Sequence, residues 1–158
     1  MAFQETFLPY VCVGDTVTCD VNGFTITARV VADDCSDAPD QRQDGFWPSL
    51  YIGDPGFIGP GRNFRERLAK AQAEAEAVMD AWRKDKWFYC GIVLAIECEG
   101  VELDHNAASL WGIEANYPGS DNAYLAEVAD ELLPEALAAG RAALKRLMSS
   151  APSQAAQG

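Results

Sequence analysis

The sequence predicts an α+β domain of two ββα units, in which a four-stranded antiparallel sheet carries two helices on one face. Three observations lead to this fold: an Asn-Gly turn between alternating strands, a second hairpin that begins with a strongly apolar strand, and an amphipathic helix after each hairpin. A chain of 158 residues suits one domain with a continuous core. We expect this domain to span residues 1–148, with a long loop at 33–61 and a disordered tail at 149–158.

The first hairpin is expected over residues 16–31. Apolar and polar side chains alternate on both sides of Asn22 and Gly23, and both residues tolerate the positive φ of a type I′ turn. This turn sets the register of the two strands, so Cys19 is expected to face Ile26.

The loop at 33–61 is rich in Asp, Gly and Pro, yet it also contains Phe46, Trp47, Tyr51 and Phe57. Aromatic residues are rare in solvated linkers, so the composition favours a packed excursion over disorder. The same aromatic residues offer a self-complementary contact, which favours a homodimer.

The first helix is expected from Asn63 to about Lys84. Asn63 and Glu66 resemble a capping box, and Asp80 and Lys84 are spaced as an i, i+4 ion pair. Apolar residues recur at helical spacing at Phe64, Leu68, Ala71, Ala75, Val78, Met79 and Trp82.

The second unit begins with residues 87–96, which are almost wholly apolar and too few to span a membrane. They predict a central strand buried on both faces. After a turn at residues 99–100, residues 101–114 are expected to return as a strand with an irregularity near 104–106. Ser120 or Asp121 is expected to cap the last helix.

Charge is the most informative bulk property, because 24 Asp and Glu oppose 12 Lys and Arg and give a net charge of −12. The segment from Trp87 to Gly140 contains no Lys or Arg. Such a chain repels nucleic acid and anionic membranes and suits a basic partner, although acidity also serves solubility alone. Its acidic residues are Glu97, Glu99, Glu102, Asp104, Glu114, Asp121, Glu127, Asp130, Glu131 and Glu135.

The sequence shows no run of apolar residues long enough to cross a membrane, and its first ten residues lack the features of a signal peptide. These features predict a cytoplasmic protein.

Support for catalysis is weak. His105 is the single histidine, and its partner in a nucleophilic dyad or a zinc site would be Cys90 or Cys98, both in an apolar strand. Glu97, Glu99 and Glu102 resemble the carboxylates of a metal-dependent nuclease, but no lysine lies near them in the sequence. We therefore expect no enzyme activity, no metal site and no cofactor.

Residues 109–122, SLWGIEANYPGSDN, place Trp111, Glu114, Tyr117 and Asp121 between a strand and a helix. Such junctions gather aromatic and polar groups usable for binding. Packing within the core is the alternative role for Trp111 and Tyr117.

Residues 82–143 contain WFYCGIV, VELDHNAASLWGIE, YPGSDN and YLAEVADELLPEAL. This stretch resembles a group of small acidic proteins carried by bacterial phages and plasmids. That resemblance implies a context of mobile elements, where proteins similar to anti-CRISPR or antirestriction inhibitors present carboxylates that mimic a phosphate backbone.

Three functions remain open: an inhibitor that binds the basic surface of a CRISPR effector complex or nuclease, an accessory interaction protein of a phage or plasmid, and a small enzyme using His105 and nearby acids. The first is favoured. Its predicted partner-binding residues are Glu97, Glu99, Glu102, Asp104, Glu114, Asp121, Glu127, Asp130, Glu131, Trp111 and Tyr117.

Overall fold

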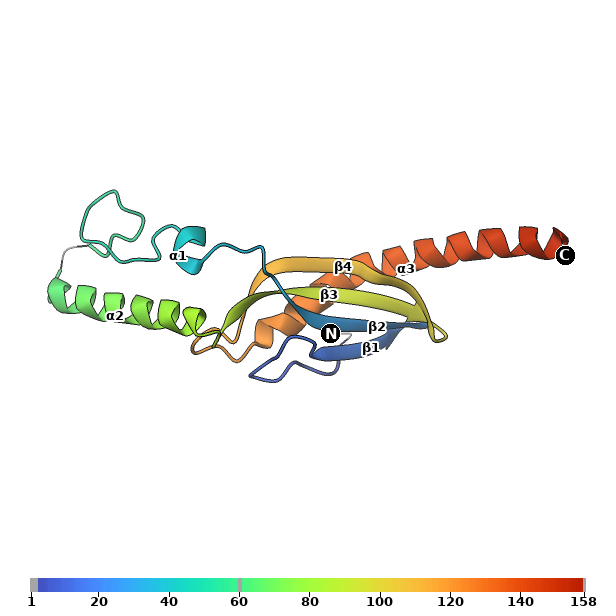
Figure 1. Cartoon of the computed structure of the whole chain (residues 1–158), viewed down its shortest axis with the longest axis horizontal. Helices are drawn as coiled ribbons and strands as arrows, with labels where there is room; N and C mark the ends of the chain where they lie inside the picture. Colours follow the sequence, from blue (N-terminus) through green and yellow to red (C-terminus); the bar gives the residue numbers. More distant parts are fainter. Residues whose placement is uncertain (1–2, 60, 158) are drawn as a thin grey trace.

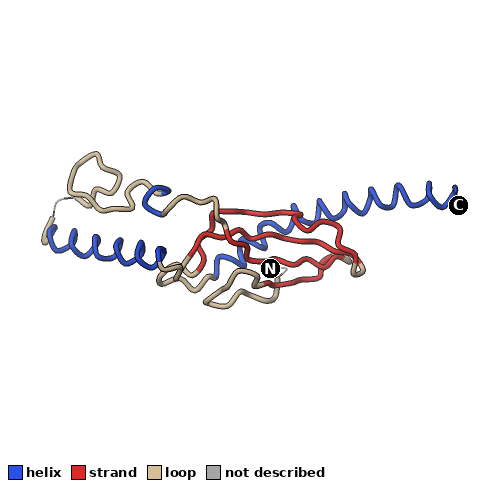
Figure 2. Tube along the Cα trace, in the orientation of Figure 1, coloured by secondary structure: helices blue, strands red, loops and turns tan. Residues whose placement is uncertain are grey.

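The computed structural model of the chain describes residues 3–59 and 61–157 and contains one four-stranded sheet (Figures 1 and 2). Its strands follow the order β1-β2-β3-β4, and each pair of neighbours is antiparallel. The predicted α+β class and four-stranded antiparallel sheet are therefore confirmed. In chain order the elements are β1 (Thr16–Val21), β2 (Phe24–Ala32), α1 (Pro39–Arg42), α2 (Phe64–Arg83), β3 (Phe88–Cys98), β4 (Val101–Ala115) and α3 (Ala123–Gln157).

The first hairpin has the expected register, with Cys19 opposite Ile26. Asn22 and Gly23 form its turn with φ values of 54° and 84°. Positive φ at both positions gives a type I′ turn, whose twist matches that of the strands it joins. The local sequence therefore determines the pairing of β1 with β2.

The strand β3 lies between β2 and β4, and α3 packs on one face of the sheet against β2, β3 and β4. Ile92, Leu94 and Ile96 have no exposed surface, and burying each such side chain contributes about 1.5–3 kcal/mol. Gly140 brings α3 close to the sheet, because a Cβ at this position would lie 2.4 Å from Cδ1 of Ile96. Ile96 therefore points towards α3.

The segment before β1 completes this core. Phe3, Phe7 and Val11 are buried in the same cluster as the strands and α3. The backbone N–H of Phe3 also donates a hydrogen bond to Oδ1 of Asp130 in α3, at 3.3 Å. The N-terminal segment thus packs beside α3 as part of the core layer.

The helix α2 lies beyond one end of the sheet, beside the segment that carries α1 (Figure 1). Of its residues only Met79 is buried, and its C-terminal end is fixed by a 2.9 Å hydrogen bond from Nε1 of Trp87 to the carbonyl of Val78. The prediction that both helices cover one face of the sheet is thus not confirmed. Small side chains such as Ala71 and Ala75 give α2 little to bury on a sheet, and part of its stripe faces the long loop instead.

Two helix ends differ from expectation. Asn63 precedes α2 in the left-handed region, with φ 55°, and its side chain makes no capping hydrogen bond, so the expected capping box is wrong. The backbone of α3 continues to Gln157, through most of the segment 149–158 for which the sequence predicts a disordered tail. Residue 158 lies outside the described residues.

Candidate functional site

The acidic residues of the second half of the chain are not neutralised by the cations of α2. Among residues 3–59 and 61–157 there is one ion pair, between Nζ of Lys84 and Oδ2 of Asp80 at 2.8 Å, and both residues belong to the α2 region. This i, i+4 pair is the one expected from the sequence. The predicted partner-binding carboxylates therefore make no ion pair with the described Lys and Arg residues.

Four of these acids form one exposed row along α3 and its start. Glu127, Glu131 and Glu135 follow one another at i, i+4 spacing, which places successive carboxylates about 6 Å apart along the helix axis. Asp121 joins them, because Asp121 and Glu127 line the same hollow next to the N-terminal segment. We call this set, Asp121, Glu127, Glu131 and Glu135, the α3 acidic stripe.

The α3 acidic stripe stands on a rigid support. On the opposite side of the same helix, Leu125, Ala129 and Ala136 are fully buried against the sheet. Burial of that face holds the helix in one orientation, so the exposed carboxylates are fixed in direction more firmly than they would be on a loop.

A second group of acids lies at the turn between β3 and β4. Glu97 is directly opposite Glu102 and also opposite Thr25, whose hydroxyl donates a 2.7 Å hydrogen bond to Asp20 on β1. Glu99 occupies the turn itself, with φ 51°. We call Asp20, Glu97, Glu99 and Glu102 the hairpin acids.

The hairpin acids and the α3 acidic stripe do not form one surface. Ile96 points towards α3, and neighbouring side chains of a strand point to opposite faces, so Glu97 lies on the face away from α3. The structure therefore divides the predicted acidic array between the helix-covered side of the sheet and the open side.

Two predicted site residues are engaged locally. The carboxylate of Asp104 accepts a hydrogen bond from the backbone N–H of Asn106 at 3.0 Å, inside the predicted irregular part of β4. Asp130 turns inward to Phe3, and its Oδ2 is buried without a hydrogen-bond partner among the described residues. Burial, and then the negative charge of Asp130, raises the pKa of Cys19 to about 11.

Trp111 and Tyr117 lie in different parts of the structure. Trp111 lies across Gly91 on β3, where a Cβ would come within 2.4 Å of its ring, and 46% of its surface is exposed. Tyr117 packs edge-on against Trp87, with ring centroids 5.0 Å apart. Trp111 is therefore available for contact on the open face, whereas Tyr117 packs in an aromatic cluster with Trp87 and Tyr89.

Glu114 lies opposite Tyr89 on the neighbouring strand. Burial raises the pKa of Glu114, and the nearby charge of Arg42 opposes that rise. The guanidinium of Arg42 lies 4.3 Å from the centre of the Tyr89 ring and donates a 2.6 Å hydrogen bond to the carbonyl of Gly112. Arg42 is thus committed to holding the long loop on the sheet.

The backbone N–H of Gly112 is also hydrogen-bonded to the long loop. Its backbone N–H donates to Oδ2 of Asp33 at 2.9 Å, and its φ of 74° favours glycine. Sequence reasoning missed this contact between the loop and β4. The available signal was a glycine inside a strand, which often marks a close approach of other groups.

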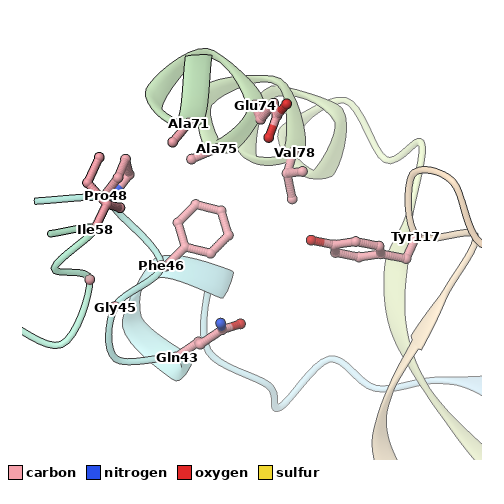
Figure 3. A pocket seen from close by; sticks show the side chains of 11 residues that line it. Gln43, Gly45, Phe46, Pro48, Ile58, Ala71, Glu74, Ala75, Val78 and Tyr117 are labelled. Carbon is pink, nitrogen blue, oxygen red and sulfur yellow. The ribbon is translucent and has the colours of Figure 1, made fainter. Parts of the chain in front are cut away.

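A cleft of about 380 Å³ separates the long loop from α2 (Figure 3). Phe46 faces Ala71, Ala75 and Val78 across it, and the hydroxyl of Tyr117 points into the space. The loop beside it folds back on itself through a bridge between Ser49 and Phe57. The cleft is lined by apolar side chains together with the polar side chains of Gln43, Glu74 and Tyr117, a mixture that suits binding but supplies no catalytic pair.

Two asparagines join the N-terminal segment to the connection between β4 and α3. Asn122 is buried, with 1% of its surface exposed, and its side chain donates 2.8 Å hydrogen bonds to the carbonyl of Pro9 and to Oδ1 of Asn116. Asn116 bonds both backbone groups of Val11 at 2.8 Å. The YPGSDN segment therefore contributes to structure through the asparagine at its end, a role that the sequence analysis did not assign.

The predicted catalytic alternatives gain no support from the geometry. Burial raises the pKa of Cys90 to about 12, which keeps this thiol protonated and unreactive near neutral pH. His105 is exposed on β4. Within the described ranges, no group of three or more His, Cys, Asp and Glu side chains is arranged to hold a metal ion.

The fold and site define an α+β protein with one helix-covered and one open sheet face, and with acids exposed on both. In the part of the chain that the structure describes, no helix has the length and apolar character needed to cross a membrane. Comparisons of the chain with protein-family models, curated proteins and solved structures find no match.

Proposed function

We propose that this protein is a non-enzymatic inhibitor of a bacterial defence system, of the anti-CRISPR type. It acts in the cytoplasm and places its α3 acidic stripe on a basic, nucleic-acid-binding surface of a CRISPR effector complex or nuclease. The observation that carries the proposal is the row of exposed carboxylates on a rigid helix, without an ion pair to any described Lys or Arg.

We choose the α3 acidic stripe over the hairpin acids because the two groups stand on different secondary structure. A helix with one face buried presents charge at fixed spacing, whereas Glu99 stands at the tip of a two-residue turn. Clustered Lys and Arg that bind phosphate attract such a row, and complementary potentials speed association. The spacing of about 6 Å compares with about 3.4 Å of helix axis per phosphate on one DNA strand.

The proposal is tested with the full chain and a panel of purified CRISPR effector complexes and restriction nucleases. Co-elution in size-exclusion chromatography reports binding, and release of a fluorescent DNA duplex reports competition. We expect the chain to bind at least one member and to displace its DNA. Failure to bind or displace DNA in every member, with no rescue of phage infection, would contradict the proposal.

Matched variants locate the surface. Neutralising Glu127, Glu131 and Glu135 to Gln together is expected to weaken binding about tenfold and to reduce its salt dependence. The control triple, in which Glu66, Glu74 and Glu76 of α2 become Gln, changes the net charge equally on exposed positions of another element. Equal loss in both triples would indicate a general charge effect and would remove α3 from the proposal.

A second candidate function is an accessory interaction protein of a phage or plasmid. The observation that favours it is the exposed apolar side chains of the long loop, since Tyr51 is 77% and Ile52 is 87% exposed. These side chains also suit the expected homodimer. Serine at both positions should abolish self-association in sedimentation experiments if the loop forms a dimer, and leave DNA displacement intact if inhibition belongs to α3.

A further inference from the structure

The N-terminal loop, residues 7–15, alternates buried and exposed apolar side chains. Phe7 and Val11 are buried in the core, with 7% and 1% of their surface exposed. Leu8, Tyr10 and Val13 are exposed by 70%, 62% and 56%. Because the exposed fraction of these three is large, the loop presents apolar surface that the described chain does not cover.

This presentation is fixed by buried polar contacts. The carbonyl of Pro9 accepts a hydrogen bond from Asn122, and both backbone groups of Val11 bond the side chain of Asn116. Further along, the N–H of Cys12 donates to Oδ2 of Asp15 at 2.9 Å. A loop held at 9, 11 and 12 loses little conformational entropy when its exposed side chains bind a partner.

Negative charge lies beside the same loop. A hollow of about 330 Å³ is lined by Thr6, Phe7 and Pro9 from the N-terminal segment and by Asp121 and Glu127 from the α3 acidic stripe. Leu8 and Tyr10 flank Pro9 in the chain and therefore stand next to the first two carboxylates of the stripe, whereas Val13 lines a separate hollow with Trp82 and Arg83. An apolar centre with a charged rim is the usual anatomy of a protein interface.

The wide spacing of carboxylates in the α3 acidic stripe is a second reason to expect an apolar contact beside it. One carboxylate per about 6 Å is roughly half the charge density of one DNA strand, so charge alone is a weak competitor for a phosphate-binding surface. Apolar side chains in a partner pocket add affinity that salt does not screen.

We propose that Leu8 and Tyr10 form the apolar anchor of the protein's interface and insert into an apolar pocket, flanked by Lys or Arg side chains, on a partner protein. The basic flanks of that pocket rest on the proposed function, since they are the groups that Asp121 and Glu127 would face. The apolar anchor itself is inferred from the exposure of its side chains, from the hydrogen bonds that hold the loop backbone, and from the position of the loop beside α3.

The test places the photo-crosslinker p-benzoylphenylalanine at Tyr10 in the full chain expressed in phage-susceptible bacterial cells. The matched control carries the same group at Tyr51, an exposed tyrosine of the long loop. We expect an adduct with a different protein from position 10 alone, joined to a peptide with apolar residues flanked by Lys or Arg, whereas position 51 joins only a second copy of this chain if the long loop forms a dimer. In the same experiment, Leu8→Ser should reduce the yield about fivefold.

Three results would overturn the anchor: no adduct from position 10, the same adduct from positions 10 and 51, or an adduct from position 10 that joins two copies of this chain. Its failure is separable from that of the proposed function. Loss of DNA displacement with a persisting adduct removes the inhibitor function and leaves the anchor. Persisting displacement that needs the α3 acidic stripe, without an adduct, removes the anchor and leaves the inhibitor function.

Discussion

Replacing Asn122 by alanine measures how strongly the N-terminal loop is fixed to the rest of the fold. The Asn122 side chain makes three hydrogen bonds of 2.8 Å, from the N–H of Asn116 and to Pro9 and Asn116. Each contributes about 1 kcal/mol net when buried. Alanine at a φ of 63° adds about 1 kcal/mol of backbone strain, so we expect a loss of about 4 kcal/mol in the free energy of unfolding.

Urea denaturation followed by circular dichroism gives this free energy, and two variants separate its parts. Asn122→Gly removes the strain and should lose about 3 kcal/mol. Asn22→Ala is the matched control, because Asn22 has a φ of 54° but is exposed and makes no side-chain hydrogen bond among the described residues. It should lose about 1 kcal/mol. A loss in Asn122→Ala no greater than in Asn22→Ala would refute the anchoring of the loop.

Three further predictions concern stability and packing. Gly112→Ala places a Cβ 2.6 Å from Nη2 of Arg42 at a φ of 74°, so it should lower the unfolding free energy by about 2 kcal/mol in urea titrations. Gly91→Ala should displace the Trp111 ring, which a Cβ would meet at 2.4 Å, and shift tryptophan fluorescence to longer wavelength; an unchanged spectrum would contradict the placement of the ring. Burial raises the pKa of Cys90 from 9.0 to about 12, so the folded state keeps a proton that the unfolded state releases. Its contribution is complete below pH 9.0 and is lost as pH rises towards about 12, and Cys90→Ala should reduce that alkaline loss in denaturation curves.

The sequence predicts best those elements whose cause is local. The register of the first hairpin follows from an Asn-Gly turn between alternating residues, and the buried strand β3 follows from a continuous apolar run. The sequence also predicts an irregularity near residues 104–106, and the pairing of β3 with β4 shifts register in that part of β4. In each case the deciding residues are neighbours in the chain.

The structural features that the sequence does not predict depend on contacts between residues that are far apart in the chain. The side chain of Asn116 bonds Val11, 105 positions earlier, and no periodicity in the sequence reports such a partner. The apolar stripe of α2 can be predicted from the sequence. The position of α2 beyond the end of the sheet, with part of this stripe facing the long loop, cannot. The distribution of charge also depends on distant contacts. The sequence gives the net charge of −12, but the division of the acids between the two faces follows only from the geometry of the sheet and α3.

The most direct test of the central claim is the salt dependence of binding between this chain and the DNA-binding effector that it captures. Dissociation constants are measured between about 50 and 200 mM salt for the chain and for the variant neutralised at Glu127, Glu131 and Glu135. The account predicts that binding weakens with salt and that the variant binds less tightly with a shallower dependence. A variant that matches the original chain in affinity and salt dependence would contradict the assignment of α3 as the binding surface.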